Sequence, residues 1–477
     1  MTFFKRLSLR QIVFKKGKGQ ITVWLSLMFL VFLSLYLVCL QSVQKQQRRQ
    51  QAEQVSQAGL FSLFSEYEPH LLERYDLFYL DTSFGSGREQ VDELCSHLWK
   101  FVDQNITSAS GKTLYNLKLE GVDIDGLERA TDDSGAVFAR QAIRVMKEKT
   151  GASLAEDWVL QEIFEKNAQS NSKKFLQDQK NYEGSVRNYE DEKDEVGAEA
   201  MEWDGLSDSF TLSKAIPGSF KVSSKAADLS LAPSHRTLSE GVGQSDGTEG
   251  KLLQKQWLVS YLCAYLDNAE EMLPGKRQNK YFDYQLEYVI AGKRSDRENL
   301  DKVIKELLLM REGANYIFLL SHQELSGQAE TLANLLAGIT GNPALIEGLK
   351  HLILIGWAYG ESLVEVRQLL GGYELSAIKK TEDWQVPLVK LLSALSHPGQ
   401  FDTPKKTQKG ISYETCLRIF LMLQSVQTLS MRALDVIEGE IRQIEGCSHI
   451  HMDHCVERIN TRIWLPEIYL ERSYGYE

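Results

Sequence analysis

Residues 21–40 are the feature that most constrains this chain, because they form an apolar run without a charged residue, a proline or a glycine. An α-helix rises about 1.5 Å per residue, so the run spans roughly 30 Å, the thickness of the hydrocarbon core of a bilayer. We therefore expect one transmembrane helix over residues 21–41. A cleaved signal peptide is the rival interpretation, but its apolar region is only about 7 to 15 residues long and ends at small residues.

The charges on either side of the run predict its orientation. Six basic residues and no acidic residue precede it, and the positive-inside rule places such a segment in the cytoplasm. Residues 1–20 are then a basic cytoplasmic segment of a protein in the cell membrane, and the bulk of the chain is extracytoplasmic. That bulk carries a net charge of about −17, which argues against nucleic acid as a partner.

Composition divides the rest of the chain into three segments. Residues 42–165 combine a helix-forming stretch with an alternating pattern at 114–124, which predicts a helix leaving the membrane and a small α+β region. Residues 166–250 are first dense in charge and then rich in Ser and Gly, so we expect a charged, flexible linker. Residues 251–477 carry apolar residues at helical spacing and are predicted to form a helical domain.

The stretch Leu345–Leu363 is the most apolar part of that domain, and a second membrane span has to be weighed. Charged and polar residues such as Glu347, Lys350 and Glu361 interrupt it, which favours a buried core helix. The predicted fold is therefore mainly α, with a single N-terminal transmembrane helix, a small α+β neck and a larger helical extracytoplasmic domain.

The segment from Cys447 to Cys455 concentrates two thiols, three imidazoles and a carboxylate. This composition suits zinc, and the candidate ligands are Cys447, His449, His451, His454 and Cys455. Their spacing matches no standard zinc finger, and in an exported protein the two cysteines more simply close a disulfide. Unpaired thiols beside surface histidines are the third interpretation. The sequence thus favours a Cys447–Cys455 disulfide and predicts no metal and no cofactor.

No contiguous motif of a hydrolase, a phosphate-binding loop or a zinc protease occurs in the sequence. Glu361, Arg367 and the pair Asp383–Trp384 lie beside apolar helical segments and could line a groove, but buried ion pairs or solvated faces explain them as well. We therefore predict no catalytic residue. A hydrolase with non-contiguous catalytic groups remains an alternative, because such groups need only meet in space.

Short blocks spread from the membrane run almost to the carboxyl end follow the pattern of one family. The blocks are Gly19–Leu27, Leu286–Lys293 with Ser295–Asp296, Arg311–Tyr316, Gly356–Ser362, Glu382–Trp384 and Tyr413–Arg418. In them the chain resembles an uncharacterised family of Gram-positive bacterial membrane proteins related to TadE and TadG, the minor pseudopilins of tight-adherence (Flp-type) pili. The resemblance implies a surface-anchored component associated with pilus assembly.

The chain departs from pseudopilins at the processing site. A prepilin peptidase site needs a glycine followed five residues later by glutamate, whereas Thr22 follows Gly17 and Trp24 follows Gly19 at that distance. We therefore expect an ordinary anchor that is not processed.

Two functions from different classes follow from these features. The first is a structural or scaffolding component at the cell surface, associated with a Tad-like pilus or secretion system, whose partners are membrane lipid along residues 21–41 and other envelope or pilus-assembly proteins. The second is an exported sensor or binding protein whose helical domain holds a small ligand or a metal. Neither function is that of an enzyme.

Overall fold

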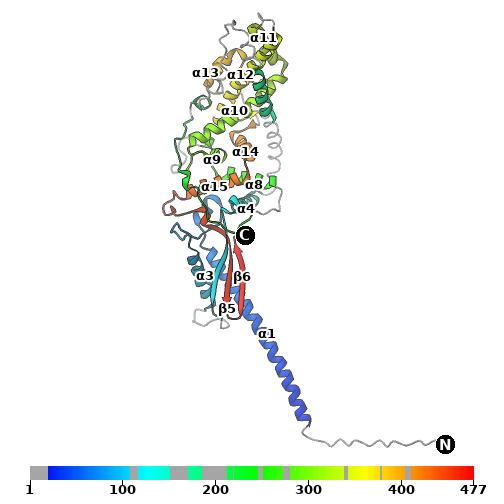
Figure 1. Cartoon of the computed structure of the whole chain (residues 1–477), viewed down its shortest axis with the longest axis vertical. Helices are drawn as coiled ribbons and strands as arrows, with labels where there is room; N and C mark the ends of the chain where they lie inside the picture. The colour runs from blue at the N-terminus through cyan, green and yellow to red at the C-terminus, as the bar shows by residue number, and fades with distance from the viewer. Residues whose placement is uncertain are drawn as a thin grey trace, which may run out of the picture. The chain divides into compact units, whose positions relative to one another are not determined.

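The computed structural model describes residues 20–107, 117–150, 170–184, 212–218, 220–244, 251–271, 280–337, 342–376, 379–402 and 410–476. The fold is mainly helical, with a long apolar N-terminal helix and small sheets, as the sequence predicts (Figure 1). The chain divides into two compact units. Unit 1 consists of Met1–Ser65, Asp92–Asp125 and Asn460–Tyr474, and unit 2 consists of Glu66–Val91, Gly126–Ile459 and Gly475–Glu477.

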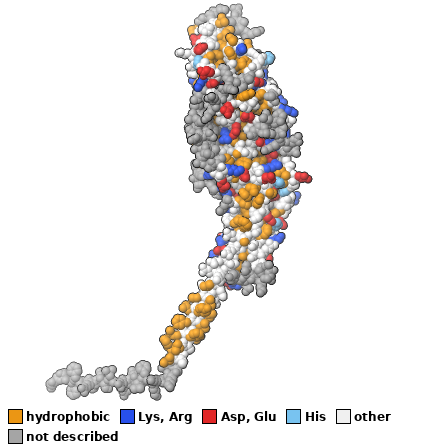
Figure 2. Space-filling view, turned by 180° about the vertical axis from the view of Figure 1, so that it is seen from behind, with side chains coloured by type: hydrophobic (Ala, Val, Ile, Leu, Met, Phe, Trp, Pro, Cys, Tyr) orange, Lys and Arg blue, Asp and Glu red, His pale blue; other side chains and the backbone are white. Residues whose placement is uncertain are grey.

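Helix α1 (Gln20–Phe64) contains the apolar run. Residues 21–41 are exposed along their whole length, and Figure 2 shows the apolar surface that they form. Within the described part of the chain, α1 is the helix that is long and apolar enough to cross a membrane. The helix continues beyond residue 40 because no proline interrupts it, and this continuation is about 36 Å long.

The carboxyl end of α1 packs into unit 1 against helix α3 (Val91–Ile106). Val55, Leu60 and Leu63 of α1 are buried, whereas Phe61 is 65% exposed. Gly59 allows the two helices to approach closely, since a Cβ atom built there would lie 2.5 Å from Cγ2 and 3.1 Å from the backbone nitrogen of Val102.

Because of this close approach, replacing Gly59 by alanine should lower the stability of the protein, whereas the same substitution inside a helix usually raises it. Gly59→Ala is expected to destabilise unit 1 by about 1 to 3 kcal/mol, because the added methyl group overpacks the contact with α3. Gly327→Ala in helix α11 is the matched control, since nothing lies within 4 Å of a Cβ atom there, and alanine should stabilise that helix by about 0.5 to 1 kcal/mol. Hydrogen exchange of α3 and α11 in both variants measures the two effects, and protection of α3 that rises in Gly59→Ala would contradict the packing.

The main sheet has the strand order β1-β5-β2, with β6 also paired to β5. The strands are β1 (Leu80–Asp81), β2 (Gly121–Arg129), β5 (Cys455–Leu465) and β6 (Ile468–Gly475). Strands β1 and β5 are antiparallel, with Leu80 opposite Val456 and Asp81 opposite Cys455. A second sheet pairs β3 (Leu375–Ser376) with β4 (Gly410–Ile411).

These strands differ from the sequence prediction in two places. The strand expected over 114–124 begins at Gly121, and residues 108–116 lie outside the described part of the chain. The helical domain predicted for 251–477 ends instead in β5 and β6, so that prediction was wrong for its last residues. Every second side chain from Cys455 to Leu465 is buried in β5, the alternation of a half-buried strand.

Helices make up most of unit 2. The α-helices are α2 (Pro69–Tyr75), α4 (Asp132–Thr150), α7 (Leu212–Ala215), α8 (Lys251–Tyr265), α9 (Gln285–Ala291), α10 (Asp296–Ser321), α11 (Gln323–Ala337), α12 (Pro343–Leu370), α13 (Leu391–Ser396), α14 (Tyr413–Leu423) and α15 (Val426–Ile441), and residues 170–184 are also helical. Short 3₁₀ helices are η3 (Leu229–Leu231), η4 (Ala269–Glu271), η5 (Thr381–Asp383), η6 (Leu388–Lys390), η7 (Pro398–Phe401) and η8 (Met452–His454).

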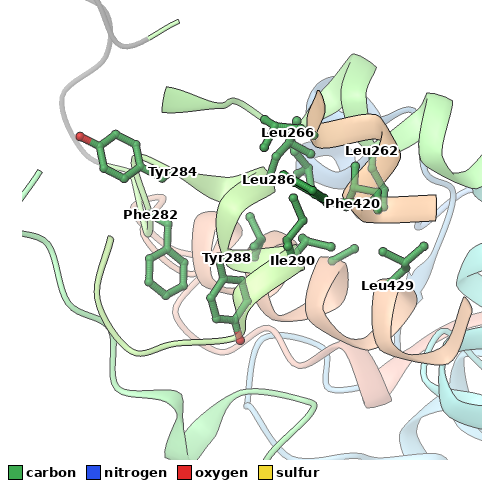
Figure 3. Close-up of a cluster of buried hydrophobic side chains, with 14 of the residues drawn as sticks. Leu262, Leu266, Phe282, Tyr284, Leu286, Tyr288, Ile290, Phe420 and Leu429 are labelled. Atoms are coloured by element: carbon green, nitrogen blue, oxygen red, sulfur yellow. The ribbon is translucent and has the colours of Figure 1, made fainter. Parts of the chain in front are cut away.

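Helix α9 lies in the larger apolar core of unit 2. Figure 3 shows Leu286 and Ile290 of α9 beside Leu262 of α8 and Phe420 of α14, and all four side chains are buried. The hydrophobic effect favours this arrangement, because each buried side chain of this size contributes about 1.5 to 3 kcal/mol.

Helix α12 is the core helix predicted for Leu345–Leu363. Asn342 caps it by accepting a hydrogen bond from the Ala344 backbone nitrogen at 3.0 Å, and Pro343 occupies its first turn. The helix packs against α10, α11 and α13, and most of its side chains from His351 to Leu370 are buried. Because other helices of unit 2 cover α12, it is a core helix and not the second membrane span that was the alternative for this stretch.

Residues 220–244, which were expected to belong to a flexible linker, pack on the helices of unit 2. Ala227, Leu229 and Ala232 are buried, and the Ala227 backbone nitrogen donates to the Arg294 carbonyl oxygen at 2.9 Å. The linker prediction was thus wrong for this stretch. Phe220 and Val222 pack against the same core, and polar contacts hold residues 234–243.

Candidate functional site

The loop after α15 contains the candidate ligands and has a fixed path. It is built from successive turns, in which the backbone nitrogen of Ile450 donates to Cys447 at 3.2 Å and that of His454 donates to His451 at 2.9 Å. Ile450 and Met452 are fully buried in the core of unit 2. The loop therefore directs each candidate side chain toward a defined partner.

The two cysteines of the loop do not form the predicted disulfide, and both are free thiols. The sulfur of Cys447 lies near ligand atoms of Glu68 and His70, whereas Cys455 begins β5 opposite Asp81. Burial, and then the charge of Glu68, raises the pKa of the Cys447 thiol, and burial raises the pKa of Cys455 well above its usual value. A metal binds the thiolate, so either sulfur would have to lose its proton before it could act as a ligand.

The three histidines of the loop contact different partners. The Nε2 atom of His449 lies 3.4 Å from Oδ2 of Asp81, and Nδ1 of His451 lies 3.6 Å from Oε1 of Glu438. The ring centre of His454 is 5.3 Å from that of His451, and its Nδ1 atom is buried without a hydrogen-bond partner. The five predicted ligands therefore do not converge on one point.

Two groups that include residues of this loop have the residue types of a metal site: Cys447 with Glu68 and His70, and His451 and Asp453 with Glu438. The ligand atoms of Glu438, His451 and Asp453 lie within 4.8 Å of one another. Glu438 is 2% exposed and Asp453 is 4% exposed. Two buried carboxylates this close together need a positive partner, because burying unpaired charge is costly.

Arg236 is the positive partner of both carboxylates. Its guanidinium donates to the two oxygens of Glu438 at 2.6 and 2.8 Å and also to Oδ1 of Asp453. The backbone nitrogens of Met452 and Ser239 donate to the remaining positions, at 2.8 Å to Glu438 and at 3.1 Å to Asp453. The guanidinium occupies the place and supplies the charge that a metal ion would have.

The pKa values of the two carboxyls agree with this pairing. Burial alone would raise the pKa of Glu438, but hydrogen bonds from His451 and Arg236 outweigh it and hold the pKa below its usual value. The pKa of Asp453 is likewise lowered, because the hydrogen bond and the charge of Arg236 outweigh burial. Both groups are therefore carboxylates at neutral pH, and the cluster is a closed ion network.

Two further carboxylates hold the same segment. Asp435 of α15 accepts hydrogen bonds from the backbone nitrogen and the hydroxyl of Ser234 at 2.8 and 2.6 Å. Asp132, at the start of α4, accepts from the backbone nitrogens of Gly241 and Gly243 at 2.9 Å each. Residues 234–243 are thus joined to α4, to α15 and to the loop that precedes β5, and we call them the strap.

The strap, the loop and helix α15 lie within one region of family similarity, whereas α4 precedes it. A family model described as a family of unknown function (DUF5702) matches residues 188–465, which is more than half of the chain. The chain belongs to the DUF5702 family. No curated protein and no solved structure matches it. The region matched by DUF5702 begins after α1 and ends at Leu465, the last residue of β5.

The DUF5702 region also contains a second buried charge network, between α10 and α12. Arg311 donates to both oxygens of Glu365 at 2.9 Å, and Lys379 donates to Glu365 and to Glu361 at 2.6 Å each. The side chains of these four residues are at most 9% exposed. Asn315 adds a hydrogen bond to Glu365 at 2.8 Å.

This network explains the polar residues that sequence reasoning left open. Glu361 also accepts from the backbone nitrogen of Val386 at 2.8 Å, so it forms a buried ion pair and faces no solvent-filled groove. Arg367 donates to Asp402 at 2.6 and 2.8 Å. Asp383 accepts from the Lys380 backbone nitrogen at 2.9 Å, and Trp384 is buried with Lys379 4.5 Å from its ring centre. Of the explanations considered, buried ion pairs account for Glu361 and Arg367.

Sequence reasoning missed Arg236 and Glu438, the centre of the first network. Glu438 lies one turn from the buried residues Leu434 and Ile441 on α15, so the helical period places a charge on an apolar face. That position was a readable signal of a buried ion pair. Arg236 carried no such signal, because it lies among Ser and Gly residues in a segment of little apolar content.

Proposed function

We propose that this chain is a membrane-anchored structural component of the cell surface, with a cytoplasmic amino terminus and an extracytoplasmic bulk. The observation that carries the proposal is the continuity of α1. One helix contains both the exposed apolar stretch 21–41 and the buried residues Val55, Leu60 and Leu63 of unit 1. A helix of this kind transmits position and force from the bilayer to the domain, and membrane lipid surrounds its first half.

The internal chemistry of unit 2 supports a structural role. In the described part of the chain, Arg236 of the strap pairs with Glu438 and Asp453, and Arg311 pairs with Glu365 of α12. Such networks fix one arrangement of helices. We propose protein–protein contacts as the activity, with other envelope proteins as the partners.

The resemblance to relatives of TadE and TadG supports a more specific place for the protein. We propose that it is a stationary component associated with a Tad-like pilus or secretion system. The absence of glutamate five residues after Gly17 or Gly19 supports a retained anchor. Within the membrane span the hydroxyls of Ser26 and Ser34 donate to the Val23 and Val31 carbonyl oxygens at 2.8 Å. A neighbouring helix would therefore contact these two residues through close packing at their small side chains and not through free hydroxyl groups.

Photo-crosslinking in native membranes tests the scaffolding role. A photoreactive residue at Phe29, Leu30, Val31 or Phe32 samples successive faces of α1, and we expect one face to give a discrete adduct with another membrane protein. In the control, residues 21–40 are replaced by leucines, which keeps the anchor and removes the shape of the helix surface. The adduct should then disappear while the protein stays in the membrane. Adducts with lipid alone from all four positions would overturn the proposal.

A further inference from the structure

A surface groove in unit 2 lies between α7 and the first half of α10. Its volume is about 720 Å³, within the range of about 300 to 1,000 Å³ that is typical of small-ligand sites. The groove is lined by Leu212, Ser213, Lys293, Arg297, Glu298, Asp301, Lys302 and Lys305. It is open to solvent and separate from both buried charge networks.

The charges of this groove are opposite to those of the chain around it. Four of the lining residues are cationic and two are acidic, although the chain beyond residue 20 is strongly acidic. Asp301 pairs with Lys305 at 2.9 Å, and Glu298 accepts a hydrogen bond from the Ser295 hydroxyl at 3.0 Å, which leaves its charge in place. The groove therefore has a positive surplus.

Lys293 and Arg297 supply that surplus. Both side chains are exposed, and neither has an ion-pair partner in the described part of the chain. The position of Lys293 is fixed, since its backbone nitrogen donates to Oδ1 of Asn299 at 2.8 Å. Helix α10 begins between the two cations, and the amino end of a helix adds partial positive charge at the same place.

We propose that the groove binds an anion that carries two or more phosphate groups. The guanidinium of Arg297 matches a phosphate in a bidentate geometry, and the ammonium group of Lys293 acts as a point charge for a second one, whereas Lys302 and Lys305 already lie beside Glu306 and Asp301. Two cations on either side of the start of α10 favour an anion with more than one phosphate over a single phosphate. The ligand source is either a free oligophosphate or a phosphodiester polymer of the envelope, since both present the same chemistry.

Calorimetric titration of the full-length protein in detergent with inorganic triphosphate, at low salt, tests this inference. We expect saturable binding that weakens at least tenfold in Arg297→Gln. The matched control is Arg294→Gln, which removes the same charge from an exposed neighbour that does not line the groove, and it should change binding less than threefold. Asp301→Asn, which removes a negative charge from the groove, should strengthen binding.

The outcomes separate a built site from general attraction. Equal weakening in Arg297→Gln and Arg294→Gln, or no saturable binding to the wild-type protein, would overturn the proposal. A second titration with a glycerol-phosphate oligomer distinguishes the sources. Tighter binding of the triphosphate assigns a free oligophosphate, and tighter binding of the oligomer assigns a phosphodiester polymer.

Discussion

Glu365→Ala is expected to destabilise unit 2 by about 3 to 5 kcal/mol, because removing one partner leaves an uncompensated charge inside the protein. Glu365 accepts hydrogen bonds from Arg311, Lys379 and Asn315. Without it, Arg311 and Lys379 share the single carboxylate Glu361. Hydrogen exchange of α10 and α12 in the full-length protein measures the loss, which should appear as reduced protection of both helices.

A double variant tests whether charge balance causes the loss. Arg311→Met combined with Glu365→Leu removes one charge of each sign and keeps Lys379 paired with Glu361. It should be less destabilised than either single variant, since an apolar pair of similar volume replaces a buried ion pair at little cost. Glu414→Ala, which breaks an exposed pair with Arg418, should cost no more than about 1 kcal/mol. Additive losses in the double variant would contradict the network as the source of stability.

Arg236→Ala is expected to release the strap at a cost of about 3 to 5 kcal/mol, because Glu438 and Asp453 would remain buried without their cation. The measurement is hydrogen exchange of peptides from residues 234–244 and 450–454. Arg236→Lys is the matched variant, which keeps the charge but cannot donate to both carboxylates as a rigid fork, so its loss should be intermediate. Unchanged protection in Arg236→Ala would mean that the strap is held by something else.

The loss in Arg236→Ala should depend on pH in a defined direction. The pKa values of Glu438 and Asp453 are lowered in the folded protein, so their contribution is present above the unfolded pKa values and is lost as the pH falls through the folded ones. The variant leaves two carboxyls that protonate easily. Its deficit relative to the wild type should therefore be largest near pH 7 and should shrink toward pH 4. Stabilisation of the wild-type strap by added zinc would contradict the closed ion network.

Elements with a strong local pattern were predictable from the sequence. The apolar run identified α1, and the charges within Leu345–Leu363 correctly favoured a core helix for α12. Strand β5 was missed although its alternation from Cys455 to Leu465 is visible, because the helical pattern of the preceding residues was extended to the end of the chain.

The strap and the loop show what a local pattern cannot reveal. The strap has few apolar residues, and its partners Asp435, Glu438 and Asp453 are about 200 positions away in the chain. The composition of 447–455 favoured a disulfide over a metal site, whereas both cysteines are free and the histidines contact different partners. The helical period could have added Glu438. No spacing rule indicates that Arg236 occupies the space between the carboxylates, since only the folded chain brings them together.

Limited trypsin digestion of right-side-out membrane vesicles tests the central proposal of a permanent anchor with an external bulk most directly. The first basic residues after the apolar run are Lys45, Arg48 and Arg49. We predict that unit 2 is digested and that a protected fragment remains. Its mass should be that of a fragment that begins at Met1 and ends at one of these three residues. A chain that is cut only after the vesicles are opened would contradict the orientation. A fragment that starts after residue 17 would contradict the permanent anchor.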